Sequence, residues 1–304
     1  MANTHASLTA LFVDIADAIR EKTGDTATIV ADDFPDVIRE RLQAAPPLPY
    51  LTFKSPNSFT LAVGDATKHW NGALEYSTDA STWSTWDGTT TLSSATSGND
   101  NVLYLRGTGN VRIAGYDLNY RWVLTGSDIA CIGNIENLLD YATVSSGVHP
   151  TMVNYCYQYM FADCASLTQA PALPATKLAS SCYQYMFAGC TGLTKAPALP
   201  ATTLAVSCYQ YMFIGCPGLT KAPALPATTL KNYCYYGMFY GCTKIKLSTT
   251  QTGEYTQEYR IPSSGTGTTA ANALTDMFTD TGGTFTGTPE INKTYYLSNT
   301  NTIV

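Results

Sequence analysis

One stretch of the chain repeats its hydrophobic pattern every 26 residues. Cysteines recur at that interval in two columns, and a Met-Phe pair lies between the two cysteines of each unit. A fixed period of this length indicates a solenoid, in which each unit buries its apolar face against its neighbours. The two columns are Cys156, Cys182, Cys208 and Cys234, and Cys164, Cys190, Cys216 and Cys242.

Within one unit the pattern predicts a short helix followed by a short strand. Cys182, Met186, Phe187 and Cys190 lie at i, i+4, i+5 and i+8, which places them on one side of a helix. Glycines end that helix. Residues 193–200 then read as a brief extended stretch, limited by prolines that cannot donate to a sheet. The pattern therefore predicts leucine-rich-repeat coils, and an α+β fold class for the chain.

The unit resembles the BspA-type bacterial surface leucine-rich repeat. The resemblance rests on the Phe-x-x-Cys segment at 187–190 and on the Leu-led stretch of residues 193–200, which ends in proline. Two features depart from that family: Cys182 replaces an aliphatic residue, and Ala-Pro replaces β-branched strand residues. The resemblance implies a solenoid fold and a bacterial adhesin that binds host glycoprotein or matrix.

Residues 1–43 read as a helical segment. Its first apolar stripe is followed by Gly24, and a second helix begins near Asp33. We expect residues 7–43 to attach or self-associate the chain; a helical cap on the next domain is the alternative. Residues 15–24 and 31–38 also resemble the N-terminal segment of phage tail and prophage structural proteins. The stripe is Leu8, Leu11, Phe12, Ile15 and Ile19.

Three further regions follow this segment. Residues 44–49 form a Pro-rich linker, and residues 50–130 alternate apolar and polar positions between turn residues, which predicts a small β-sandwich. Residues 131–304 would form the leucine-rich-repeat solenoid, with a first cap at 134–141 and a hairpin insertion at 249–267. The expected sandwich strands are 51–53, 59–63, 74–76, 102–105 and 111–113.

Composition narrows the range of functions. The net charge is −6 and no Lys or Arg run occurs, so we expect no nucleic-acid partner. No apolar stretch approaches the ~20 residues of a membrane span, and the start of the sequence lacks the pattern of a secretion signal.

The units from Cys182 and Cys208 differ at five of 26 positions, whereas an active site needs unlike groups at one point. We therefore expect no enzyme activity and no cofactor.

The eight repeat cysteines invite three interpretations: disulfides, metal ligands or packed thiols. Eight residues span ~12 Å of helix, and packed helices lie ~8–10 Å apart, both beyond the ~7 Å limit for a disulfide. The three histidines, His5, His69 and His149, lie outside the regular units, which disfavours zinc. We predict buried, reduced, metal-free thiols.

Aromatic side chains are the candidate binding residues. The repeated tyrosines either stand outward as a ladder of rings or wedge between coils as core, and the sequence leaves both open. Two tryptophans follow a segment that resembles an Asp-box hairpin, so a structural role competes with stacking on a sugar. The candidates are Tyr157, Tyr159, Tyr183, Tyr185, Tyr209, Tyr211, Trp83 and Trp86.

Two function classes follow from these features. The first is a structural or receptor-binding component of a phage tail or prophage particle, assembled in the cytoplasm and contacting a protein or glycan on a cell surface. The second is a bacterial cell-surface adhesin of BspA type. A carbohydrate-active enzyme is a distant third.

Overall fold

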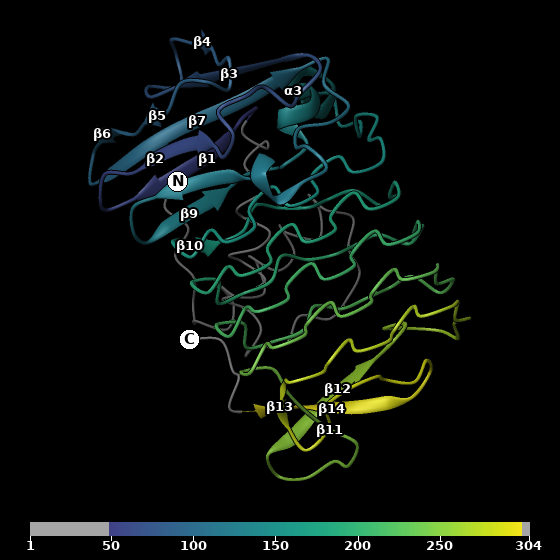
Figure 1. Cartoon of the computed structure of the whole chain (residues 1–304). Coiled ribbons are helices and arrows are strands. Elements are labelled where there is room, and N and C mark those ends of the chain that lie inside the picture. Colours follow the sequence, from purple (N-terminus) through teal and green to yellow (C-terminus); the bar gives the residue numbers. More distant parts are fainter. Residues whose placement is uncertain (1–48, 300–304) are drawn as a thin grey trace, which may run out of the picture. The chain divides into compact units, whose positions relative to one another are not determined.

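The computed structural model describes residues 49–299, which belong to one compact unit. The predicted helical segment 1–43 and nearly all of the linker at 44–49 lie outside the described residues. The described part is β-rich, with three sheets and little helix. In Figure 1, strands β1–β10 lie at one end of this unit, strands β11–β14 at the other, and the repeat units lie between.

The first sheet contains seven strands in the order β10-β9-β1-β7-β3-β4, with β6 also paired to β7. A second sheet has the order β5-β2-β8. Alternate residues are buried in several of these strands, as in β2, where Leu61 and Val63 enter the core. The strands are β1 Leu51–Ser55, β2 Thr60–Val63, β3 Ala73–Ser77, β4 Ser84–Thr85, β5 Leu92–Ser93, β6 Ala95–Ser97, β7 Asp100–Thr108, β8 Trp122–Thr125, β9 Ile129–Ile132 and β10 Leu167–Gln169.

Four of the five expected strands are confirmed, as β1, β2, β3 and β7. The strand expected at 111–113 is wrong. Its amides bond outside any sheet: the Val111 N–H donates to the Asn71 side chain, and the Ile113 N–H donates to the Cys156 carbonyl. The segment thereby joins the sheets to the first repeat unit.

The one α-helix of residues 49–299, α3 Asn137–Ser145, occupies the region expected as a cap. It packs closely on β7. The close approach requires glycine, because a Cβ at Gly107 would lie 1.7 Å from the Leu138 carbonyl oxygen. A 3₁₀ turn, η2 Leu118–Tyr120, precedes β8. The bridge between Asn134 and Ala172 joins the start of this region to the first repeat unit.

The segments expected as short helices are wrong: they are runs of consecutive turns. In the first unit, Tyr155, Tyr159 and Asp163 all have φ near +60°, which interrupts a helix at every fourth residue. The N–H groups alternate between two kinds of acceptor. Gln158 and Met160 donate to carbonyls three residues earlier, whereas Tyr157, Tyr159 and Phe161 donate to carbonyls of the next unit.

The same alternation recurs in the units that follow, up to the bonds from residues 233–241 to residues 271–279. Hydrogen-bonded neighbouring chains lie about 4.8 Å apart, much closer than the ~8–10 Å of packed helices. The inter-unit spacing assumed from the sequence was therefore too large. Distance between units does not by itself exclude disulfide bonds.

Each unit contributes one phenylalanine to a column of stacked rings in the core. From Phe161 to Phe187 the ring centroids are 5.6 Å apart, and the column ends on Phe278 of the last unit. All nine cysteines are buried and free, as packed thiols are expected to be. Several donate to the main chain of the preceding unit; the Cys190 thiol lies 3.0 Å from the Phe161 carbonyl oxygen.

A four-stranded sheet of order β12-β14-β11-β13 covers the C-terminal end of the units. The expectation of a hairpin at 249–267 is wrong, because its strand β12 pairs with β14 near the end of the chain. The strands are β11 Lys246–Ser248, β12 Tyr255–Arg260, β13 Gly282–Gly283 and β14 Thr294–Ser298.

Candidate functional site

The candidate tyrosines separate into two columns with opposite environments. Tyr157, Tyr183 and Tyr209 are buried and stack with centroid distances of 5.6 and 5.7 Å. Burial raises the pKa of each of these phenols well above its ordinary value. These three residues belong to the core, so they offer no surface to a partner.

The second column, Tyr159, Tyr185 and Tyr211, is half-buried, and we name it the surface tyrosine ladder. Its ring centroids are 4.8 and 5.0 Å apart, with interplanar angles of 9° and 22°. Each residue has a φ between 54° and 57°, so all three rings leave the main chain in the same direction. Since the rings lie face to face, solvent reaches their edges and hydroxyl groups rather than their faces.

The phenols of the ladder stay protonated at neutral pH. Partial burial, with Tyr159 and Tyr236 nearby, raises the pKa of Tyr185 to about 12. Partial burial and the Asp117 carboxylate raise the pKa of Tyr159. A protonated phenol both donates and accepts hydrogen bonds, so the ladder presents a row of paired donors and acceptors.

The ladder meets further aromatic rings beyond Tyr211. At the C-terminal side, Tyr211 meets the ring of Tyr236 edge-on at 5.2 Å. Tyr236 in turn lies 5.7 Å from the exposed ring of Tyr233 and directs its hydroxyl toward Asp276, at 3.5 Å. The aromatic surface therefore continues onto the fourth unit, beyond the residues that the sequence singled out.

A row of glutamines in the turns beside the ladder fixes its register. The Gln158 amide donates to the Gln184 side-chain oxygen at 2.6 Å, and Gln184 donates to Gln210 at the same distance. Such a row requires consecutive units to be aligned residue for residue. Sequence reasoning missed the row, although the three glutamines recur at the 26-residue interval.

A second group of exposed aromatics lies at the start of the units. Tyr116 and Tyr155 meet edge to face at 5.3 Å, and the Arg112 guanidinium lies 4.6 Å from the Tyr116 ring centre. Tyr116 is 56% exposed. Neither tyrosine was a candidate from the sequence, because only the fold brings the 112–116 loop to the first unit.

The two candidate tryptophans are not brought to the ladder by any contact of the described residues. Trp86 is buried and its indole N–H donates to the Thr90 carbonyl. Trp83 is half-buried, and the Arg106 guanidinium lies 4.0 Å from the centre of its ring. Arg106 is also paired with Glu75 at 2.7 Å. One face of Trp83 is therefore already occupied by a cation.

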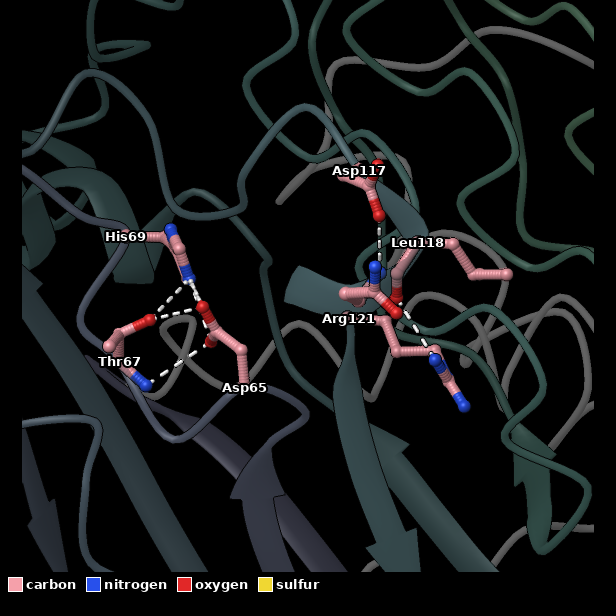
Figure 2. A network of polar contacts seen from close by, with 7 residues as sticks. Asp65, Thr67, His69, Asp117, Leu118 and Arg121 are labelled. Carbon is pink, nitrogen blue, oxygen red and sulfur yellow. Dashed lines mark hydrogen bonds and ion pairs between the residues drawn. The ribbon is translucent and has the colours of Figure 1, made fainter.

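One polar cluster combines a histidine, a carboxylate and a hydroxyl, and Figure 2 shows it beside the turn that contains Asp117 and Arg121. The same His69 nitrogen, Nε2, lies 2.9 Å from Asp65 and 3.0 Å from Thr67. A catalytic relay instead needs the base to contact its nucleophile and its orienting carboxylate through different nitrogens. The His69 imidazole ring also stacks on the Tyr120 ring, with their centroids 4.2 Å apart. The cluster has the geometry of a loop support.

Within residues 49–299, no three side chains of His, Cys, Asp or Glu are placed to hold a metal ion. Over the same residues, no helix is long and apolar enough to cross a bilayer. Among the candidate binding residues, the surface tyrosine ladder extends over three successive units. Comparisons with protein-family models, with curated proteins and with solved structures found no match to this chain.

Proposed function

We propose that residues 131–304 form a leucine-rich-repeat-like solenoid, preceded by a β-sandwich domain at 50–130. Three features support the solenoid: the hydrogen bonds that each unit gives to the next, the rows of like residues 26 positions apart, and the continuous columns of Tyr and Phe rings. The coils of this solenoid consist of turns, in place of the helix-plus-strand coils of the BspA family.

We further propose that the chain is a non-enzymatic binding protein that displays a repetitive face to a protein or glycan on a cell surface. The observation that carries this proposal is the surface tyrosine ladder, Tyr159, Tyr185 and Tyr211. Phenol hydroxyls repeated about every 5 Å can each make one weak hydrogen bond with a repetitive partner. Contacts of that kind become effective when several form together.

The setting that we favour is a phage tail or prophage particle that contacts a host surface. It rests on the resemblance of residues 15–24 and 31–38, with residues 7–43 providing attachment or self-association. The alternative setting is a bacterial adhesin that binds host glycoprotein or matrix. Both settings use the same surface, and they differ in the partner.

The test is to display the full chain multivalently and measure its binding to two panels, bacterial cell envelopes and extracellular-matrix glycoproteins. The decisive variant changes Tyr159, Tyr185 and Tyr211 together to Phe, which keeps the ring stack and removes the hydroxyls. The matched control makes the same change at the buried Tyr157, Tyr183 and Tyr209. We expect the surface variant to lose at least ~10-fold in avidity and the control to lose none.

Binding to envelopes would support the particle setting, and binding to matrix glycoproteins would support the adhesin. Equal binding by the surface variant and the unchanged protein would remove the ladder from the proposal. Absence of binding to both panels, with the protein multimerised, would contradict the binding function itself.

A further inference from the structure

A concave site lies apart from the tyrosine ladder, where the residues on either side of α3 meet the first repeat unit. It is a cavity of about 470 Å³, within the range of small-molecule sites. One wall comes from residues 149–152 and the other from residues 175–179. Glu136, next to the first residue of α3, contributes a carboxylate to the lining.

The Glu136 side chain is only 2% exposed, which is unusual for a carboxylate. Its Oε2 atom lies 2.8 Å from Nδ1 of His149, and the His149 side chain is 50% exposed. Burying a carboxylate costs several kcal/mol, and an apolar pair of similar volume is often no less stable. A position that breaks this rule inside a cavity is a candidate functional site.

Hydrogen bonds hold the 175–179 wall and the main chain at Glu136 in place. Thr202 and Thr203 donate their N–H groups to the Thr176 carbonyl, and the Leu178 N–H donates to the Thr203 carbonyl at 2.9 Å. On the opposite side, the Glu136 N–H donates to the Asn134 side chain at 2.8 Å. The part of the lining that is fixed in this way is pre-organised for a ligand.

The chemistry of the lining suits a ligand that carries both donors and acceptors but no net charge. Glu136 accepts hydrogen bonds, Lys177 donates them, and Thr176 does both. Met152 and Leu178 add apolar surface, which C–H groups of a ligand can cover. An acidic residue, Glu136, and a basic residue, Lys177, line the same cavity, so neither an anion nor a cation is favoured over a neutral polyol.

We propose that this cavity binds a neutral sugar residue, with Glu136 accepting from its hydroxyl groups and Lys177 donating to its oxygens. The site is independent of the surface tyrosine ladder and of the proposed solenoid display. A Glu136–His149 hydrogen bond that only tied the 146–152 loop to the start of α3 would need neither the cavity nor a lysine in its lining.

The repeats provide variants that preserve the local fold. Lys177 is Thr203 and Thr229 in the next two units, so Lys177→Thr gives the first unit the residue that its neighbours have at this position. Lys221 corresponds to Gln169 in the first unit, so Lys221→Gln is an equivalent exchange outside the cavity lining and serves as the control. Glu136→Gln keeps the side-chain volume and removes the charge.

The probes are methyl α-glucoside, methyl β-galactoside, methyl α-mannoside and methyl β-N-acetylglucosaminide, with N-acetylneuraminic acid and arginine methyl ester as charged comparisons. Saturation-transfer NMR on the full chain measures binding, and thermal unfolding checks that each variant is folded. We expect at least one neutral glycoside to bind with a Kd on the order of 1 mM. Glu136→Gln and Lys177→Thr should each weaken it ~10-fold or more, and Lys221→Gln should leave it unchanged.

Three results would overturn the proposal: no neutral glycoside bound at about 20 mM, tighter binding of either charged probe, or glycoside binding that neither Glu136→Gln nor Lys177→Thr weakens. If Glu136→Gln fails to fold, Lys177→Thr alone decides. The triple Tyr→Phe variant of the ladder should bind the glycoside normally, so failure of this site and failure of the ladder remain distinguishable.

Discussion

The main-chain N–H of Phe161 donates to the carbonyl oxygen of Met186 at 2.9 Å, across 25 residues of sequence. Phe187 donates to Met212, Phe213 to Met238 and Phe239 to Met277 in the same way. The Met-Phe pair is therefore a hydrogen-bonding position as well as a hydrophobic one. Each unit depends on the next for its hydrogen-bond acceptors, so deleting one unit tests how the fold depends on these bonds.

Removing residues 182–207 should leave a folded protein. Ser181 would then precede Cys208, and each lost hydrogen bond would be replaced by the same bond to the next unit. In repeat proteins stability is approximately a sum over units and their interfaces, so we expect a lower Tm with a single unfolding transition. Circular dichroism during heating measures both.

The matched control removes residues 182–194, half of that segment, which shifts the register of every later residue. This variant should be far less stable than the 26-residue deletion, because the Tyr, Phe and Cys residues of the first unit would no longer align with the equivalent residues of the units that follow. Equal stability of the two deletions would contradict the dependence on register.

The free energy of unfolding should fall as the pH rises above about 9. Burial raises the pKa of the Cys234 thiol to about 11 and of Cys164 and Cys216 to about 12, from the ordinary value of 9.0. Between these values the unfolded chain releases protons that the folded chain retains, so alkali favours unfolding. Urea titrations at pH 8 to pH 11, about one pH unit apart, measure the slope.

A Cys234→Ala variant should have a shallower slope than the unchanged protein. Ala273 occupies the position of Cys234 in the last unit, so alanine is compatible with this site. A free energy of unfolding that stays constant across the pH range would show that the pKa values of the thiols are the same in the folded and unfolded chains.

Gly107→Ala should destabilise the protein by about 2–3 kcal/mol, because the new Cβ would meet the Leu138 carbonyl oxygen and force α3 away from β7. Gly253→Ala is the control, since nothing lies within 4 Å of a Cβ at that position. It should change the free energy of unfolding by less than about 0.5 kcal/mol. Comparable losses for both variants, measured by urea unfolding, would contradict the close approach of helix and strand.

Tyr183→Phe should leave stability unchanged or raise it by up to about 1 kcal/mol. The Tyr183 hydroxyl is buried without a hydrogen-bond partner, so its removal relieves a desolvation cost and preserves the ring stack. Tyr157→Phe is the comparison, because the Tyr157 hydroxyl donates to the Ile135 carbonyl at 3.4 Å. We expect that variant to lose about 0.5 kcal/mol. If Tyr183→Phe lost more stability than Tyr157→Phe, the Tyr183 hydroxyl would have a hydrogen-bond partner or the Tyr157 hydroxyl would lack one.

The repeat period could be predicted from the sequence, but the conformation of a unit could not. Residues spaced at i, i+4 and i+8 lie on one side of a helix, and a run of four-residue turns produces the same spacing. The distinguishing signal is the left-handed residue at every fourth position. Gly189, Gly215 and Gly241 mark it in three units, whereas Asp163 hides it in the first.

The candidate tyrosines illustrate the same difficulty. The sequence left outward and inward roles open for both Tyr183 and Tyr185, although residues two apart lie on different sides of a helix. In the observed turns they occupy alternate positions, so Tyr183 enters the core and Tyr185 reaches solvent. Glu136 and His149 were passed over because 13 residues separate them, and only the loop after α3 brings them to 2.8 Å.

In the proposed solenoid, the regular hydrogen bonding between units sets a constant distance from one unit to the next. In that arrangement each unit would add about 4.8 Å between the strands that precede the repeats and the sheet that follows them. The units from Cys182 and Cys208 differ at only five of 26 positions, so one can stand in for the other with little change in sequence. Lineages that gain or lose a 26-residue segment would therefore change the reach of the molecule in fixed steps while keeping both terminal structures.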